Sequence, residues 1–199
     1  MPAIHADALA AEYTALTEAC GLLDRSERGK LALSGRGAVE FLNGQVSNEL
    51  ADLCPGEGRY AAFLTHKGKM LGDLRILAVG DQRSGAPAEL LLDTERVALQ
   101  ALFDMILRFK VGYEVELHKR TLERGLLSLI GPEADLADVR WLADERLGGG
   151  EHDNAPVEID GVGALAVRTD VGVDLICQAD ETQTLIGALL RRGAVPVSA

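Results

Sequence analysis

Hydrophobic residues recur along this chain with two spacings, about every third or fourth residue in some segments and about every second residue in others. The first spacing is typical of amphipathic helices and the second of half-buried strands. Helical spacing predicts four helices and one shorter helical turn, over residues 6–22, 39–44, 94–108, 180–192 and 47–53. Alternation and short apolar runs predict eight strands, over residues 29–35, 59–65, 70–79, 89–93, 111–117, 126–130, 163–169 and 173–177.

Several element ends carry their own signals. Gly21 stands where the first helical pattern stops, which is typical of a helix C-terminus. Asp180 and Gln183 have the spacing of a capping box at the start of the last helix. The four residues 66–69 include Gly68 and separate two strands, so they predict a tight β-hairpin. The alternation is clearest in residues 111–117.

The order of these elements predicts an α+β fold with antiparallel sheets flanked by helices. Several predicted strands follow one another with hairpin-length connections. A wound parallel sheet would instead need a longer crossover, usually a helix, between successive strands.

Composition narrows the class of protein. The chain has 199 residues with 20 Lys or Arg and 31 Asp or Glu, a formal net charge of -11. Because phosphate contacts need a basic face, this acidity argues against direct nucleic-acid binding. No apolar run approaches the roughly 20 residues of a membrane helix. The three cysteines form no CxxC pair, which argues against a metal site or disulfide framework and favours a cytoplasmic protein.

The predicted hairpin is the one candidate for chemistry, because no catalytic or nucleotide-binding motif of known spacing occurs in the sequence. Arg59, Lys67, Lys69 and Arg75 lie in or beside it. A locally basic loop is able to hold an anionic group such as a carboxylate or phosphate. The alternative is a solvated turn, since Lys and Gly are common beside turns.

The same hairpin carries a family resemblance. Residues 20–26 and 31–48 resemble the opening of the glycine-cleavage T-protein superfamily, and residues 58–75 resemble its YgfZ branch. Residues 107–111 and 130–132 are similar to further segments of these proteins. The resemblance therefore extends, in order, over nearly the whole chain.

This resemblance implies an architecture of two interleaved subdomains. The first is discontinuous and comprises residues 1–27 and 120–199, and the second is a sheet-plus-helices subdomain over residues 28–119 inserted into it. The third, β-rich domain of the superfamily is absent from this chain. The YgfZ branch also carries a Lys-Gly-Cys segment not found before Ala199, so either the chain is a fragment or the protein does without that motif.

The function that the resemblance implies is a tetrahydrofolate-binding accessory factor for iron–sulfur cluster assembly or maintenance. Its expected partners are iron–sulfur proteins or their assembly machinery. Six residues are expected at the folate site: Tyr60, Leu91, Asp93, Arg59, Lys67 and Lys69. The first three match the family's folate contacts, and the last three are the cations expected near the glutamyl tail. For Asp93 a helix cap is an equal alternative.

The alternative function is that of a folate-dependent aminomethyltransferase or demethylase. T-proteins carry an Asp-Asp pair after the hairpin turn, and the first Asp is catalytic. Here Gly72 and Asp73 match this pair. Gly72 has no carboxylate to accept a proton, which argues against transfer chemistry. Asp73 keeps a carboxylate, and it is expected on the opposite sheet face from residue 72.

Overall fold

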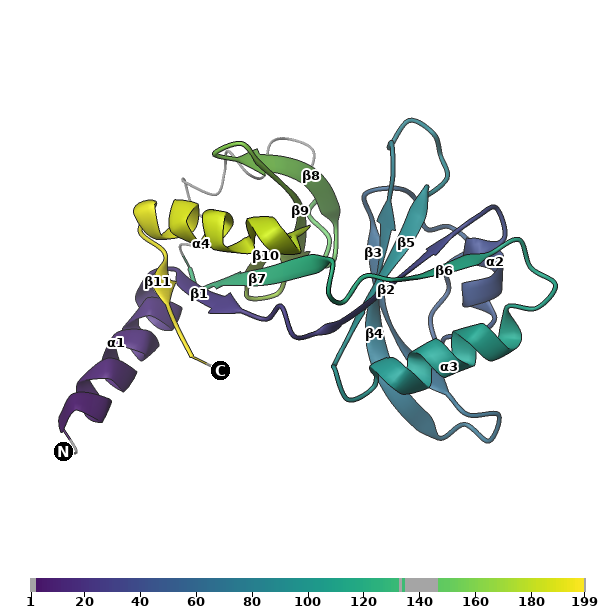
Figure 1. Cartoon of the computed structure of the whole chain (residues 1–199), viewed down its shortest axis with the longest axis horizontal. Coiled ribbons are helices and arrows are strands. Elements are labelled where there is room, and N and C mark those ends of the chain that lie inside the picture. The colour runs from purple at the N-terminus through teal and green to yellow at the C-terminus, as the bar shows by residue number, and fades with distance from the viewer. Residues whose placement is uncertain (1–2, 133, 135–146, 199) are drawn as a thin grey trace. The chain divides into compact units, whose positions relative to one another are not determined.

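The computed structural model describes residues 3–132, 134 and 147–198, which form helices and two sheets (Figure 1). The helices are α1 (Ala3–Glu18), α2 (Ala38–Asn43), α3 (Leu99–Phe109) and α4 (Thr182–Arg191), with a 3-10 helix η1 (Ala179–Glu181) before α4. The strands are β1 (Gly21–Asp24), β2 (Gly29–Ser34), β3 (Gly58–Leu64), β4 (Met70–Val79), β5 (Glu89–Thr94), β6 (Glu116–Lys119), β7 (Arg124–Ile130), β8 (Asn154–Ile159), β9 (Val162–Thr169), β10 (Gly172–Gln178) and β11 (Val195–Pro196). The predicted α+β class is confirmed.

The chain folds as two compact units. Unit 1 comprises Met1–Ser26, Gly125–Leu147 and Ala155–Ala199. Unit 2 comprises Glu27–Arg124 and Gly148–Asn154. Along the chain, the main part of unit 2 is inserted between β1 and β7 of unit 1.

Unit 2 is built on a five-stranded antiparallel sheet in the order β3-β4-β5-β2-β6. The strands predicted at residues 59–65, 70–79 and 89–93 share this sheet, as expected for the hairpin and its neighbour. One face packs against α2 and α3, because the apolar sides of these helices need burial. The fully buried side chains of this core include Leu31, Phe41, Leu74, Ile76, Leu92, Leu102 and Ile106.

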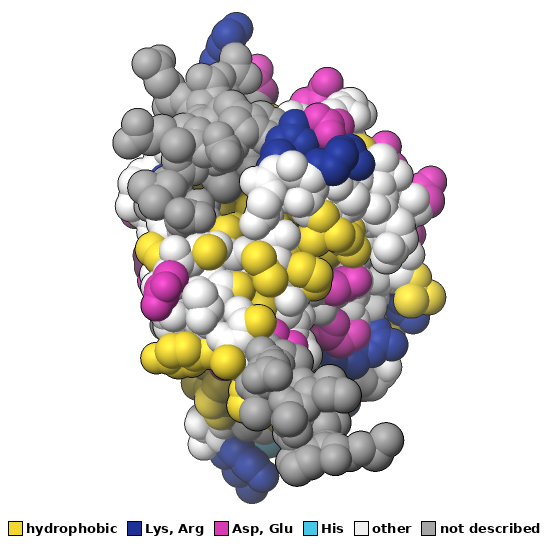
Figure 2. All heavy atoms as spheres, turned by 90° about the vertical axis from the view of Figure 1, so that its left-hand side faces the viewer, with side chains coloured by type: hydrophobic (Ala, Val, Ile, Leu, Met, Phe, Trp, Pro, Cys, Tyr) yellow, Lys and Arg dark blue, Asp and Glu magenta, His cyan; other side chains and the backbone are white. Residues whose placement is uncertain are grey.

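Unit 1 contains a six-stranded sheet in the order β11-β1-β7-β10-β9-β8, in which β1 and β11 are parallel. α4 covers it through Leu185 and Leu189, and the buried Cys20 and Cys177 belong to the same core. Figure 2 shows the surface at the α1 and α4 end, where hydrophobic side chains lie among charged ones. On α1, Tyr13 is exposed.

Gly148–Asn154 belongs to unit 2. The predicted boundary at residue 120 had placed this segment in the first, discontinuous subdomain. The backbone N–H of Asn154 donates to Gly56 O at 2.7 Å, and its side-chain Nδ2 donates to Glu57 O at 2.9 Å. Gly58 permits the close approach, because a Cβ there would lie 2.5 Å from the carbonyl oxygen of His152. These long-range contacts attach the segment to unit 2, and local sequence patterns do not report them.

Residues 47–53 do not form the predicted helical turn. They run beside β3 instead, where Ser47 Oγ accepts from the Ala62 N–H at 2.8 Å and Asn43 Oδ1 accepts from the Leu50 N–H at 2.6 Å. Short polar side chains compete in this way with helical hydrogen bonds. The buried Leu50 and Leu53 produced the helical spacing without a helix.

The strand predicted at residues 111–117 begins only at Glu116. Gly112 has a φ of +92°, which turns the backbone, and Val111 is 83% exposed. The partner strand β2 ends at Ser34, which pairs with Glu116. Alternation alone therefore overestimated this strand, because its first half has no neighbour to pair with.

Three helix ends in the structure also differ from those that the sequence predicted. Gly21 opens β1 rather than ending a helix, because it pairs with Ile130 of β7. α3 begins at Leu99, since Thr94 is still paired within the sheet of unit 2. Asp180 lies in η1 and makes no capping hydrogen bond, because the junction N–H of Thr182 donates to a backbone carbonyl.

Candidate functional site

A row of polar residues crosses four strands of the unit 2 sheet. Tyr60 on β3 pairs with Arg75 on β4, Arg75 pairs with Asp93 on β5, and Asp93 pairs with Lys30 on β2. Residues directly opposite one another in an antiparallel sheet point to the same face. Because strand neighbours alternate between faces, this polar row lies on the face opposite α2 and α3.

Asp93 is the centre of the polar row and is fully buried. Its Oδ1 accepts from Arg28 Nε at 2.8 Å and its Oδ2 accepts from Arg75 Nε at 2.8 Å, while Arg75 Nη2 forms an ion pair with Oδ2 at 2.6 Å. Burial acts to raise the pKa of Asp93, but the charge of Arg75 and the hydrogen bonds from Arg28 outweigh it and hold that pKa below its usual value. The carboxylate is therefore charged and shared by two arginines.

Cations surround Asp93 on this face. Arg28 also forms an ion pair with Glu95. Burial acts to lower the pKa of Arg28, but its bonds to Asp93 and Glu95 more than compensate and raise it. Lys30 is fully buried and its Nζ donates to the Arg28 carbonyl at 3.0 Å. Buried charges of this kind are stable only when they are paired and hydrogen-bonded.

Tyr60 presents an exposed aromatic ring beside the buried charges, with 53% of its surface accessible. Its hydroxyl donates a hydrogen bond to Asp73, and this bond raises the pKa of the Tyr60 phenol above its usual value. The His152 ring lies nearby, with 6.2 Å between ring centroids and an interplanar angle of 32°. Tyr60, at one end of the polar row, thus lies beside Asp73 and His152, and part of this group is exposed to solvent.

Gly72 and Asp73 point to opposite faces of β4, as the alternation predicted. Gly72 pairs with Phe63, and a Cβ at residue 72 would lie 2.7 Å from Ala98 Cβ and 2.8 Å from the Phe63 ring. A carboxylate at residue 72 would therefore enter the apolar core. Asp73 is the residue of this pair that faces Tyr60, so Gly72 by itself does not remove a carboxylate from the polar face.

The six predicted folate contacts are placed differently by the fold. Tyr60, Leu91 and Asp93 share the polar face, although Leu91 is 4% exposed and Asp93 has no exposed surface. Arg59 pairs with Ile76 and thus points to the other face, with its guanidinium near Glu57. The hairpin loop carries the last two, which are exposed: Lys67 and Lys69. The predicted cleft lined by Tyr60, Leu91 and Asp93 stays a prediction.

Asp93 also does not serve as the helix cap considered as its alternative. It lies inside β5, and the following helix begins at Leu99 with no side-chain cap. Sequence reasoning missed Arg28, Lys30 and His152 as members of this face. A Lys or Arg within a Leu-rich strand is a usable signal for a buried ion pair, whereas nothing local to His152 indicates its place.

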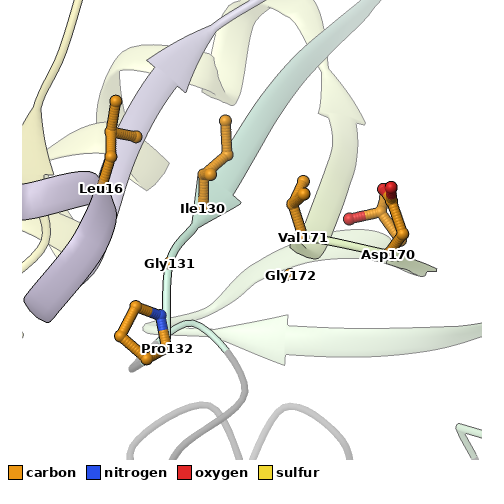
Figure 3. A pocket seen from close by; sticks show the side chains of 8 residues that line it. Leu16, Ile130, Gly131, Pro132, Asp170, Val171 and Gly172 are labelled. Atoms are coloured by element: carbon orange, nitrogen blue, oxygen red, sulfur yellow. The ribbon is translucent and has the colours of Figure 1, made fainter. Parts of the chain in front are cut away.

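Two cavities lie elsewhere. One of about 470 Å³ in unit 1 is lined by α1, the end of β7 and the β9–β10 turn (Figure 3). Its ionisable residue is Asp170. The other, of about 360 Å³ in unit 2, lies beside α2 and includes Arg36 and Glu89. Neither cavity includes Tyr60 or Asp93.

The residues that the structure describes include neither clustered metal ligands nor a membrane-spanning helix. No cluster of three or more His, Cys, Asp or Glu side chains there is arranged to hold a metal ion. Within the same ranges, no helix combines the length and apolarity needed to cross a membrane.

Comparison with known proteins gives a consistent family. The model of the GCVT N-terminal domain matches residues 2–195. An aminomethyltransferase of Geobacillus kaustophilus is 29% identical over 194 residues, covering 92% of this chain and 50% of the relative. An aminomethyltransferase of a Synechococcus strain is 29% identical over 202 residues, covering 98% of this chain and 54% of the relative. The chain thus spans about half the length of these curated relatives.

Two solved structures share the fold. The glycine cleavage system aminomethyltransferase T of Bartonella henselae superposes with a TM-score of 0.73 at 24% identity, covering 94% of this chain and 50% of that one. A chain of the heterotetrameric sarcosine oxidase of Corynebacterium sp. U-96 superposes with a TM-score of 0.59 at 20% identity, covering 97% of this chain and 96% of that one.

Proposed function

Because this chain belongs to the GCVT N-terminal domain family, we propose that it binds tetrahydrofolate on the polar face of the unit 2 sheet. The observation that carries this proposal is the exposed Tyr60 ring beside a buried row of charges. The ring matches the family's hairpin tyrosine and offers apolar area to a flat ligand, while fixed polar groups orient it.

Leu91 and Asp93 of β5 are the other proposed contacts. They share one face of the sheet with Tyr60, two strands away from it. Lys67 and Lys69 are the cations proposed for the glutamyl tail, because they are exposed and long enough to follow a mobile anionic group. Arg59 is a weaker candidate, since its guanidinium is already near Glu57 on the other face.

The first experiment measures tetrahydrofolate binding by calorimetric titration under reducing conditions. Tyr60→Ala should weaken binding about tenfold, because it removes an aromatic contact worth roughly 1–2 kcal/mol. Tyr113→Ala is the matched control, since Tyr113 is also partly exposed in unit 2 but its ring contacts Phe41. Equal affinities of wild type and Tyr60→Ala would exclude Tyr60 from the site, and a wild-type chain without affinity would argue against the folate proposal.

We propose that this binding serves iron–sulfur cluster assembly or maintenance. The resemblance of residues 58–75 to the YgfZ branch supports this role, and iron–sulfur proteins or their assembly machinery are the corresponding partners. The test compares iron–sulfur enzyme activities in cells that lack the protein and in cells that carry wild type or Tyr60→Ala. Unchanged activities in the deficient cells would contradict this role while leaving folate binding in place.

Aminomethyl transfer is the second candidate function, and Asp73 is the observation that favours it. Asp73 faces Tyr60 on the polar face, so a carboxylate is available there to accept a proton or stabilise a cation. The names of the relatives agree with this chemistry. An assay of one-carbon transfer to tetrahydrofolate decides between the functions. Transfer that is lost in Asp73→Asn supports catalysis, and binding without transfer supports the accessory role.

A further inference from the structure

We infer that Arg75 and Arg28 are the side chains that meet an acceptor oxygen of the ligand, and that Asp93 acts through them as a positioning residue. This inference rests on the proposed folate site. It changes the role of Asp93 from a ligand contact to the group that orients both arginines.

Asp93 has no surface left for a ligand. Its side chain is completely buried, and each carboxylate oxygen already accepts a charged hydrogen bond from an arginine. A pterin could reach Asp93 only after one of these bonds had broken. Breaking a buried ion pair leaves an uncompensated charge, which is among the most unfavourable local changes in a protein.

The two arginines have the surface that Asp93 lacks. The Arg28 and Arg75 side chains each keep 10% of their area exposed. Arg75 is the direct cross-strand partner of Tyr60, so the two side chains leave the sheet on the same face. Arg28 is joined to Arg75 through Asp93, which both arginines bind on this face.

The ion pairs also give the arginines a defined orientation. A guanidinium is planar and carries five N–H donors in a rigid arrangement. Asp93 binds the Nε side of each one, at 2.8 Å in both cases. Because Asp93 binds one edge of each guanidinium, the arginine side chain has less rotational freedom before a ligand binds. This preorganisation increases the affinity that directional hydrogen bonds provide.

A flat ligand with an acceptor oxygen is the chemistry that fits this surface. The Tyr60 ring offers an apolar contact, and oriented N–H groups beside it select for a carbonyl or carboxylate oxygen. In a folate that oxygen belongs either to the pterin ring or to the glutamate tail. Tetrahydrofolate and a tetrahydropterin without the aminobenzoyl-glutamate portion distinguish these two sources.

The central experiment compares wild type with Arg75→Lys, which keeps the charge but loses the planar fork. We expect tetrahydrofolate affinity to fall about tenfold, the loss of one charge-assisted hydrogen bond. Arg120→Lys is the control, because Arg120 bonds to Glu89 and Glu123 outside the polar row. An equal loss for the tetrahydropterin assigns the ring carbonyl, and a loss for tetrahydrofolate alone assigns the glutamate.

A second variant covers the case in which Arg75→Lys is unstable. Arg75→Met with Asp93→Leu removes both members of one ion pair, and Arg28, which also loses Asp93, keeps its ion pair with Glu95. The loss of stability should therefore be smaller than in Asp93→Ala, where both buried arginines lose their carboxylate. A folded double variant should bind tetrahydrofolate at least tenfold more weakly. If either variant binds as tightly as wild type, the inference is wrong and the folate proposal stands, whereas a wild type without affinity overturns both.

The positioning role of Asp93 has its own readout. In wild type, the Nε–Hε resonances of Arg28 and Arg75 should shift when tetrahydrofolate is added. Asp93→Asn keeps the shape and one acceptor oxygen, so it should move these resonances before any ligand is present and weaken binding. Weaker binding with unmoved arginine resonances would mean that Asp93 contacts the ligand itself, which overturns the positioning role.

Discussion

The two faces of the unit 2 sheet come from the same strands but have opposite physical characters. One face buries Leu31, Leu74, Ile76 and Leu92 under α2 and α3. The other carries the polar row around Asp93. The apolar face gains free energy simply by leaving water, whereas the polar face is stable only while each buried charge keeps its partners.

Within one strand, the residues on the apolar face contribute to stability, and the residues on the polar face form the candidate site. A shift of a single residue along β4 moves a side chain from one face to the other. Gly72 and Asp73 are adjacent, yet one faces the Phe63 ring and the other faces Tyr60. An argument about a missing catalytic residue therefore depends on which face the position occupies.

Removing the carboxylate at the centre of the polar row should have the largest effect on the stability of the fold. Asp93→Ala leaves Arg28 and Arg75 buried without their carboxylate, so we expect it to lower the free energy of unfolding by about 3–5 kcal/mol. Ile76→Val, on the apolar face, should lower it by only about 0.5–1.5 kcal/mol. Urea unfolding measures both. Similar losses for the two variants would mean that the charged face does not depend on Asp93.

Filling the space at Gly72 should have the next largest effect. A Cβ at this position would lie 2.7 Å from Ala98 Cβ, so we expect Gly72→Ala to destabilise the chain by about 1–3 kcal/mol. Gly163→Ala is the matched control, because Gly163 is also in a strand and no atom lies within 4 Å of its added Cβ. Urea unfolding in which both variants behave alike would argue against close packing at residue 72.

Acid should weaken the polar face before the apolar one. The pKa of Asp93 is lowered below its usual 3.8 in the folded chain. Its contribution to stability is therefore present above pH 3.8 and is lost as the pH falls through the folded value. We expect the free energy of unfolding to decline below about pH 4 in wild type and to decline less in Asp93→Asn. Parallel pH profiles would contradict this assignment.

The smallest effect is expected at the exposed edge of the polar face. Asp73→Asn removes the charged acceptor of the Tyr60 hydroxyl, so the raised pKa of that phenol should return toward 10.0. In wild type the bond contributes stability below the unfolded pKa and loses it as the pH rises through the folded value. Because Tyr60 is half-exposed, the stability change should stay within about 0.5 kcal/mol. Absorbance titration of the phenol, with Tyr60→Phe to assign the signal, measures the shift.

The sequence by itself determined the elements whose signals are local and repeated. The apolar runs in β4 and β5, the tight turn between β3 and β4, and the apolar face of α3 all appear in the residues that form them. These patterns were sufficient because the hydrophobic effect acts on each element separately, through the period of its own backbone.

Only the tertiary structure decided what those residues touch. Arg28 and Asp93 are 65 residues apart, and Asn154 reaches Glu57 from 97 residues away. The helix-like spacing of residues 47–53 was overruled by hydrogen bonds to Asn43 at the end of α2 and to Ala62 in β3. The alternation of residues 111–117 was overruled over its first half because β2 pairs with this segment only from Glu116 onward. Ion pairs and strand pairing join positions by distance in space and not in sequence, so no local pattern carries that information.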